Sequence, residues 1–179
     1  MQIADKSRDT KGLLIVALIC GVLQLALAPN IALGNGRANF ALVFAAVIAL
    51  SRGGSQGVVA GFCAGLFFDL STTGPIGLMA GILTVASHIL GSEQRNRMAG
   101  DFAASVVSFS AASLACSVVY SLAMLLVGQS SSFLDALFLR AVPTAFLTIV
   151  AFLPFAYYFS RVKAGGSGLS GGHFSRRGL

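Results

Sequence analysis

Long apolar runs separated by short clusters of charge are the feature of this sequence that most restricts its fold. Of the 179 residues, 56% are hydrophobic and only 10% are charged, and the mean hydropathy is +0.85. Soluble domains carry about 25% charged residues. In hydrocarbon, a helix of about 20 apolar residues satisfies its own backbone hydrogen bonds while it crosses the bilayer. The sequence therefore predicts an all-α, polytopic membrane protein.

Six segments are predicted to be membrane-spanning helices. They cover residues 13–33, 38–50, 55–70, 74–90, 102–127 and 134–159, the last beginning at 134 or at 141. The second run is short, so it is either a complete crossing or a partly buried, re-entrant segment. The fourth helix is expected to start with Pro75 at its first helical position, where the missing N–H costs nothing.

The first apolar run also has a second interpretation. Its segment Ala26-Leu27-Ala28 resembles a signal-peptidase site, so the run could be a cleaved signal sequence. However, Pro29 directly after that site fits cleavage poorly, and the run continues to residue 33. A membrane-spanning helix is therefore the favoured prediction.

Positive charge follows an inside–outside pattern across six crossings. With a cytoplasmic N-terminus, ten of the twelve Lys and Arg residues fall on the cytoplasmic side, and Arg37 and Arg140 are the two on the outer side. Cytoplasmic loops of membrane proteins are enriched in Lys and Arg. The pattern predicts a cytoplasmic segment at 1–11, a six-helix domain at 12–160, and a disordered, basic, glycine-rich cytoplasmic tail at 161–179. Because orientation explains the net charge of +6, we predict no nucleic-acid partner.

Small residues recur every four positions in the third predicted helix. Gly57, Gly61, Gly65 and Asp69 form one stripe, and Gly77 and Gly81 repeat the spacing in the fourth helix. Glycines at this spacing allow two helix backbones to approach closely in a membrane. We therefore expect the two helices to form a tight hairpin through these faces, which leaves room for part of the stripe to receive a partner helix.

Asp69 ends this stripe and has two possible roles. It could cap the following turn beside Ser71, Thr72 and Thr73. Alternatively, it faces the interior of the bundle and pairs with a donor on the fourth helix or on a partner protein, because carboxylates at membrane depth are rare and costly. Its place on the glycine stripe favours the second role.

Motifs for catalysis and for metal binding are missing from the sequence. It has no glycine-rich phosphate loop, no zinc-protease pattern and no nucleophile elbow, so we predict no catalytic residue, no metal and no cofactor. The three cysteines, Cys20, Cys63 and Cys116, lie in apolar segments and are expected to be packing residues.

The pattern Gly61-Phe-x-x-Gly65-Leu-x-x-Asp69, followed by Gly74-Pro75-Ile76-Gly77-Leu78, resembles the signature of the bacterial rod shape-determining protein MreD family. The specific match covers roughly residues 57–91. The resemblance implies a compact bundle similar to the substrate-binding S components of vitamin transporters, in the bacterial cytoplasmic membrane. It also implies a non-enzymatic scaffold of the cell-elongation complex. The implied partners are the bitopic protein MreC, the MreB filament, RodA with its penicillin-binding partner, and membrane lipid.

A solute-binding S component of an ATP-driven transporter is the alternative function. The serine-rich helix at 102–127 would then form the polar wall of a solute pocket. Against this alternative, the chain has no Trp and only three Tyr, and we expect no cluster of polar and aromatic residues to converge on a pocket. A small channel would require a polar ring that the sequence does not contain.

Overall fold

The computed structural model describes residues 2–33, 35–96, 102–129 and 132–167. Within them the chain is almost entirely helical, as predicted. The six α-helices are α1 (Gln2–Ala26), α2 (Phe40–Arg52), α3 (Gly54–Ser71), α4 (Leu78–Asn96), α5 (Phe102–Leu126) and α6 (Val142–Ser167). A short antiparallel hairpin joins α1 to α2 and consists of β1 (Ala32–Leu33) and β2 (Gly36–Arg37). A π-helical segment, η1 (Asp135–Ala141), leads into α6.

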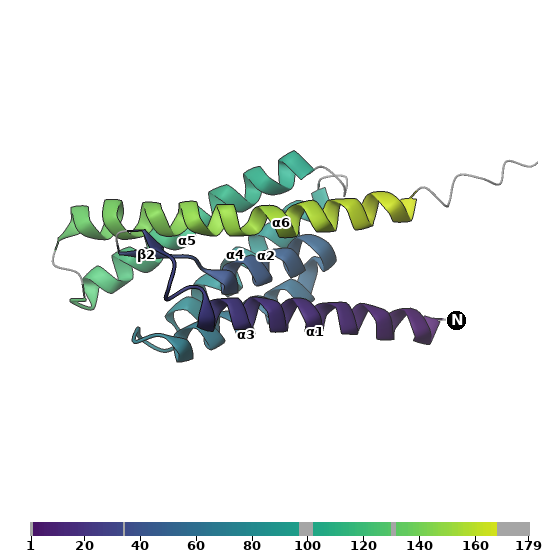
Figure 1. Cartoon of the computed structure of the whole chain (residues 1–179), viewed down its shortest axis with the longest axis horizontal. Coiled ribbons are helices and arrows are strands. Elements are labelled where there is room, and N and C mark those ends of the chain that lie inside the picture. The colour runs from purple at the N-terminus through teal and green to yellow at the C-terminus, as the bar shows by residue number, and fades with distance from the viewer. Residues whose placement is uncertain (1, 34, 97–101, 130–131, 168–179) are drawn as a thin grey trace, which may run out of the picture.

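The helices form an elongated bundle. Figure 1 shows α1 and α6 running along the long axis, with α2 and α4 between them. The N-terminal end of α1 and the C-terminal end of α6 lie at the same end of the bundle, and β2 lies toward the other end. An even number of passages through the bundle produces this arrangement.

Helix α2 is the central helix of the bundle. Its buried residues include Leu42, Val43, Ala46 and Ala49, and it packs against all five other α-helices. It has only 13 residues, which is about 20 Å of helix, whereas the hydrocarbon core of a bilayer is about 30 Å thick. The helix alone is therefore shorter than the hydrocarbon core, and the non-helical residues directly before it, Ala38 and Asn39, are buried by the protein.

Polar side chains of neighbouring helices satisfy this buried backbone. The N–H of Asn39 donates to Thr148 Oγ1 of α6 at 3.0 Å, and the N–H of Phe40 donates to Gln24 Oε1 of α1 at 2.8 Å. Asn39 Oδ1 accepts from the N–H of Leu42 at 3.0 Å and so caps α2. Irregular backbone at membrane depth is stable only when protein groups replace water in this way.

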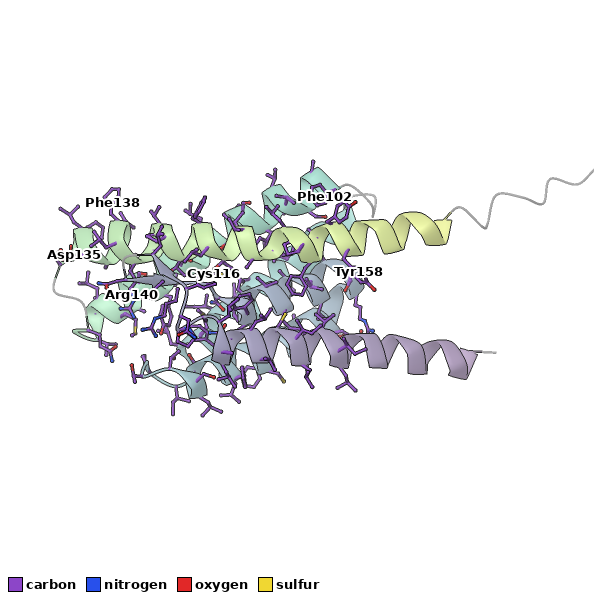
Figure 2. The ribbon with its side chains drawn as sticks, in the orientation of Figure 1. Phe102, Cys116, Asp135, Phe138, Arg140 and Tyr158 are labelled. Carbon is purple, nitrogen blue, oxygen red and sulfur yellow. The ribbon has the colours of Figure 1, made fainter. Side chains whose placement is uncertain are left out.

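Large apolar side chains cover the outside of the bundle. Leu18 of α1, Val59 of α3, Val107 of α5 and Phe146 of α6 are each at least 59% exposed. Two segments, Phe102–Leu126 and Asp135–Tyr158, are long and apolar enough to cross a membrane, and the other apolar helices are shorter. Figure 2 shows Asp135, Phe138 and Arg140 at one end of the bundle, with Phe102 and Tyr158 toward the other. The exterior is therefore suited to lipid.

Three predicted boundaries differ from the structure. Helix α1 ends at Ala26 because the chain turns there, where the N–H groups of Leu27 and Ala28 both donate to the carbonyl of Leu23. Helix α4 begins at Leu78, so the prediction that Pro75 occupies its first position is wrong. Helix α6 continues to Ser167, so residues 161–167 of the predicted tail are helical. Residues 168–179 lie outside the described part of the chain.

Candidate functional site

The tight contact between α3 and α4 is built around two glycines of α3. A Cβ atom at Gly65 would overlap the backbone of Ala80, and one at Gly61 would lie 2.7 Å from the carbonyl oxygen of Leu83. Real Cβ atoms do not approach backbone atoms this closely. The bare backbone of α3 therefore sets the distance between the two helices.

The first glycine of the stripe contacts a different helix. A Cβ atom at Gly57 would lie 2.8 Å from the Cα atom of Ala49, on α2. Gly57, Gly61 and Gly65 are all buried. The three glycines therefore pack against helices of their own chain, and none leaves an open groove.

Asp69 caps the start of α4. Its side chain is 1% exposed. Its Oδ2 atom accepts hydrogen bonds from the N–H groups of Gly77 at 2.8 Å and Ala80 at 3.1 Å, and its Oδ1 atom accepts from Met79 at 3.1 Å. The donors of a helix N-terminus have no partner within the helix, and a negative charge there interacts favourably with the helix dipole. The carboxylate thus holds the ends of two helices together.

Gly77 gives the chain the conformation that this cap requires. Its φ angle is +97°, a left-handed conformation that side-chain-bearing residues rarely adopt. Pro75 lies two residues earlier in the turn, and its carbonyl accepts from the N–H of Leu78 at 3.3 Å. The motif Gly74-Pro75-Ile76-Gly77, which follows Asp69, therefore forms a single hydrogen-bonded turn.

Gly81 does not contribute to the α3–α4 contact. A Cβ atom at Gly81 would have no neighbour within 4 Å, and the residue is exposed. The face of α4 that packs on α3 instead carries Ala80, Leu83 and Ser87, at three- and four-residue spacing. The expectation that Gly81 packs against α3 is therefore wrong, because Gly81 lies about 100° around the helix from Ala80. Gly77 does meet α3, through its hydrogen bond to Asp69.

One buried hydroxyl in this contact has no hydrogen-bond partner among the described residues. The Oγ atom of Ser87 makes no hydrogen bond within the described part of the chain, and a Cβ atom at Gly61 would overlap it. A buried polar group without a partner lowers the stability of the folded state.

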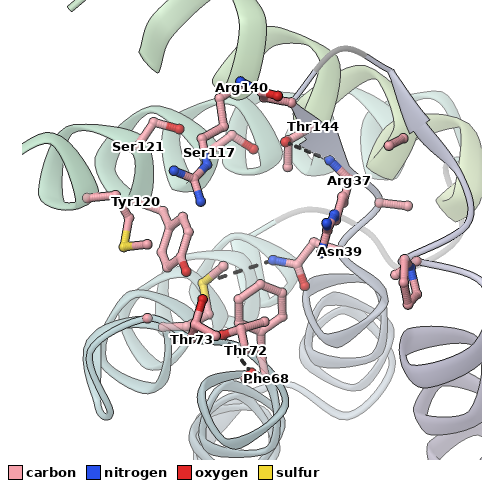
Figure 3. Close-up of a pocket in the computed structure, with 18 of the residues that line it drawn as sticks. Arg37, Asn39, Phe68, Thr72, Thr73, Ser117, Tyr120, Ser121, Arg140 and Thr144 are labelled. Carbon is pink, nitrogen blue, oxygen red and sulfur yellow. Dashed lines mark hydrogen bonds between the residues drawn. The ribbon is translucent and has the colours of Figure 1, made fainter. Parts of the chain in front are cut away.

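A polar pocket opens between α1, the β-hairpin, the turn after α3, the end of α5 and η1. Its volume is about 720 Å³. Figure 3 shows Arg140 extending from η1 toward Ser117 and Tyr120, and Arg37 extending from β2 toward Asn39. The other polar residues of the wall are Gln24, Asn35, Ser71, Thr72, Thr73, Ser121, Gln129, Asp135 and Thr144. Its volume lies in the range of small-ligand sites, but its wall is more polar than is usual for one, so a ligand would have to be polar.

The β-hairpin fixes one wall of this pocket against the start of α6. A Cβ atom at Gly36 would lie 2.7 Å from the backbone nitrogen of Thr144. The N–H of Arg37 donates to Thr144 Oγ1 at 3.2 Å, and the N–H of Asn35 donates to the carbonyl of Leu139 at 3.0 Å. The π-helical segment η1, which contains Leu139, forms the adjoining part of the wall, and such a distortion often occurs at functional sites.

The prediction that no polar and aromatic residues converge on a pocket is therefore wrong. The lining residues come from segments that are far apart in sequence, and no local motif unites them. One signal was present: Arg37 and Arg140 are the two cations that the charge pattern assigns to the outer side. Ser117 and Ser121 do form part of a polar wall, as the serine-rich helix suggested.

The nucleophilic and metal-binding side chains are dispersed. Cys20 and Cys116 are buried free thiols, Cys63 is exposed, and His88 is exposed near the end of α4. Within the residues that the structure describes, no three His, Cys, Asp or Glu side chains form a group that could hold a metal ion.

Comparison with protein families identifies the chain. Residues 9–162 match the model of the rod shape-determining protein MreD family. No curated protein and no solved structure matches the chain. Because the family model covers most of the sequence, the chain belongs to the MreD family, a family of membrane proteins that determine rod shape.

Proposed function

From its membership of the MreD family, we propose that this chain is a non-enzymatic scaffold of the bacterial cell-elongation complex. It binds the single-span protein MreC in the cytoplasmic membrane. Through that contact it helps to couple MreB filaments to peptidoglycan synthesis by RodA and its penicillin-binding partner. The family match, which spans residues 9–162, is the observation that carries this proposal.

The proposed topology has six crossings with both termini in the cytoplasm. The N-terminal end of α1 and the C-terminal end of α6 lie at the same end of the bundle, which supports an even number of crossings. The distribution of Lys and Arg supports the cytoplasmic assignment of that end. In this topology α2 crosses as a short central helix, and the bundle is similar to the S components of vitamin transporters.

We propose that the MreC helix docks on the exposed face of α4. Gly77 and Gly81 have open space where a Cβ atom would lie. Val85 and Ile89 continue the same face at four-residue spacing and are 60% and 58% exposed, and Ile76, in the turn before α4, is 71% exposed. A face that combines exposed small residues with exposed apolar side chains suits close packing of a second membrane helix. Gly57, Gly61, Gly65 and Asp69 would support this surface from within the bundle.

Co-purification from the native host tests this function. The tagged chain is extracted in mild detergent, and the proteins that elute with it are identified by mass spectrometry. We expect a single-span protein with a large extracellular domain, with or without cell-wall synthases. Recovery of no such protein, or of ATPase and energy-coupling subunits in its place, would contradict the proposal.

Two variants locate the contact within the same experiment. Gly81→Leu fills the proposed groove, so it should reduce recovery of the single-span protein about tenfold or more. Gly12→Leu is the matched control, because Gly12 of α1 is also an exposed helical glycine with open space around it. If both variants recover the partner as well as the unmodified chain does, the contact lies on another face.

A further inference from the structure

The two arginines of the pocket have no counter-charge in contact among the described residues. Within the part of the chain that the structure describes, neither Arg37 nor Arg140 forms a salt bridge, and neither guanidinium donates a hydrogen bond. Each guanidinium offers five N–H donors in a planar fork. The pocket therefore contains two sets of strong, unused donors. This is unusual for a protein of which only 10% is charged.

Further hydrogen-bonding groups surround these cations. Ser117 and Ser121 are 6% and 2% exposed and make no hydrogen bond within the described residues. Both line the pocket beside Tyr120. By contrast, Asn39 and Thr144 already use their side-chain oxygens to accept backbone N–H groups. The two guanidinium groups are donors only, and the serine hydroxyls can also donate, so a ligand with several oxygen acceptors would satisfy these groups.

The charges of the pocket favour an anion. Arg37 and Arg140 contribute two positive charges, and Asp135 in the first turn of η1 contributes one negative charge, so the net charge of the wall is +1. Guanidinium groups bind phosphate and carboxylate oxygens through paired hydrogen bonds. A phosphate group has more acceptor oxygens than a carboxylate, so it can accept from a guanidinium group and from neighbouring hydroxyl groups at the same time. A volume of about 720 Å³ exceeds the space that a bare phosphate needs.

The place of the pocket in the bundle indicates where such a group would come from. The pocket lies where α1, α3 and α5 end, and its lining includes the exposed apolar side chains Leu25 and Leu139. The ends of membrane helices lie at the depth of lipid headgroups. We propose that this pocket binds a phosphate group, either that of a phospholipid headgroup or a free phosphate anion, through Arg37 and Arg140.

Lipid binding by the full-length chain tests this inference. The protein is purified in a phosphate-free maltoside detergent and titrated with phosphatidylglycerol, with diacylglycerol of the same acyl chains, and with inorganic phosphate. Native mass spectrometry counts bound lipid, and thermal unfolding reports binding of phosphate. We expect phosphatidylglycerol to bind much more tightly than diacylglycerol. We also expect Arg37→Gln with Arg140→Gln to weaken that binding about tenfold for each arginine.

Two further variants separate pocket chemistry from general charge. Arg52→Gln removes an exposed cation at the end of α2, away from the pocket, and should bind as the unmodified chain does. Arg140→Lys keeps the charge but loses the planar fork, so its affinity should lie between those of the unmodified and double-variant chains. If the double variant does not fold, Arg140→Lys and the single variant Arg37→Gln decide the result.

The ligand titrations distinguish the two sources of phosphate. Arginine-dependent binding of phosphatidylglycerol without a response to inorganic phosphate assigns the pocket to a lipid headgroup. An arginine-dependent shift in unfolding temperature with inorganic phosphate assigns it to a free anion. The proposal is overturned if neither probe binds, if diacylglycerol binds as well as phosphatidylglycerol, or if the arginine variants bind as the unmodified chain does. These outcomes are independent of whether MreC is a partner.

Discussion

The N–H of Gly77 donates a hydrogen bond of 2.8 Å to the carboxylate of Asp69, eight residues earlier in the chain. The pair explains why an acidic residue is tolerated so deep in an apolar hairpin. Gly77 adopts a left-handed conformation that turns the chain, and the first amides of α4 then point at the carboxylate. The hydrogen bond between these two residues therefore joins the end of α3 to the start of α4.

Asp69→Asn should destabilise the protein by about 2 kcal/mol or more. In the native protein, three backbone N–H groups donate to the two oxygens of the Asp69 carboxylate. The asparagine side chain has only one acceptor oxygen, and it lacks the negative charge that interacts favourably with the helix dipole. Thermal unfolding in detergent measures the loss. Asp135→Asn is the control, because that carboxylate is exposed and accepts no hydrogen bond within the described residues. Equal unfolding temperatures for the two variants would contradict the capping role.

Gly77→Ala and Gly81→Ala should have opposite effects on stability. Both positions have room for a Cβ atom, so only the backbone differs. At Gly77 the positive φ angle makes alanine unfavourable by about 1–2 kcal/mol, whereas alanine within a helix at Gly81 is favourable by up to about 1 kcal/mol. Unfolding temperatures of the two purified variants test this. A stabilising Gly77→Ala substitution would contradict the assigned turn.

Gly61→Leu should prevent correct packing of α3 on α4. Its side chain would have to occupy the space of the Leu83 carbonyl and of Ser87. Gly12→Leu introduces the same side chain on α1, where there is open space, and should fold normally. Size-exclusion chromatography of the two variants provides the comparison. A monodisperse Gly61→Leu variant with an unchanged unfolding temperature would show that the glycine contact is not required.

Ser87→Ala should leave stability unchanged or raise it by about 1 kcal/mol, because it removes a buried hydroxyl without a partner. Thr148→Val is the opposite case. Its hydroxyl is fully buried, accepts from Asn39 N–H and donates to the carbonyl of Thr144, so the loss should be about 1–3 kcal/mol. The unfolding temperatures should therefore change in opposite directions, or Ser87→Ala should show no change. A strongly destabilising Ser87→Ala would indicate a partner for that hydroxyl.

Hydrophobicity alone predicted much of the fold. The prediction for the fifth helix, 102–127, differs from α5 by one residue, and the prediction for the third, 55–70, differs from α3 by one residue at each end. The ends of α1 and α4 were less predictable. Ile31 and Leu33 are apolar yet lie in or beside a hairpin, and the hydrogen bonds of Asp69, not the proline, determine where α4 starts. Tertiary contacts determine where α1 ends and where α4 begins, and these contacts cannot be read from a single sequence.

The candidate sites were predictable to different degrees. Regular spacing identified the glycines of α3 because a helix converts a four-residue period into one face. The same spacing gave a false result at Gly81, since a period does not say which neighbour a face meets. The pocket was missed because Arg37, Tyr120 and Arg140 are brought together only by the complete fold.

Photo-crosslinking in living cells tests the central claim of an MreC-binding scaffold most directly. A photoreactive phenylalanine analogue is placed at Val85, on the exposed face of α4, or at Val107, an equally exposed position on α5. The account predicts a covalent adduct with a single-span membrane protein from Val85 and little or none from Val107. No adduct from Val85, or an adduct from Val107 alone, would contradict it.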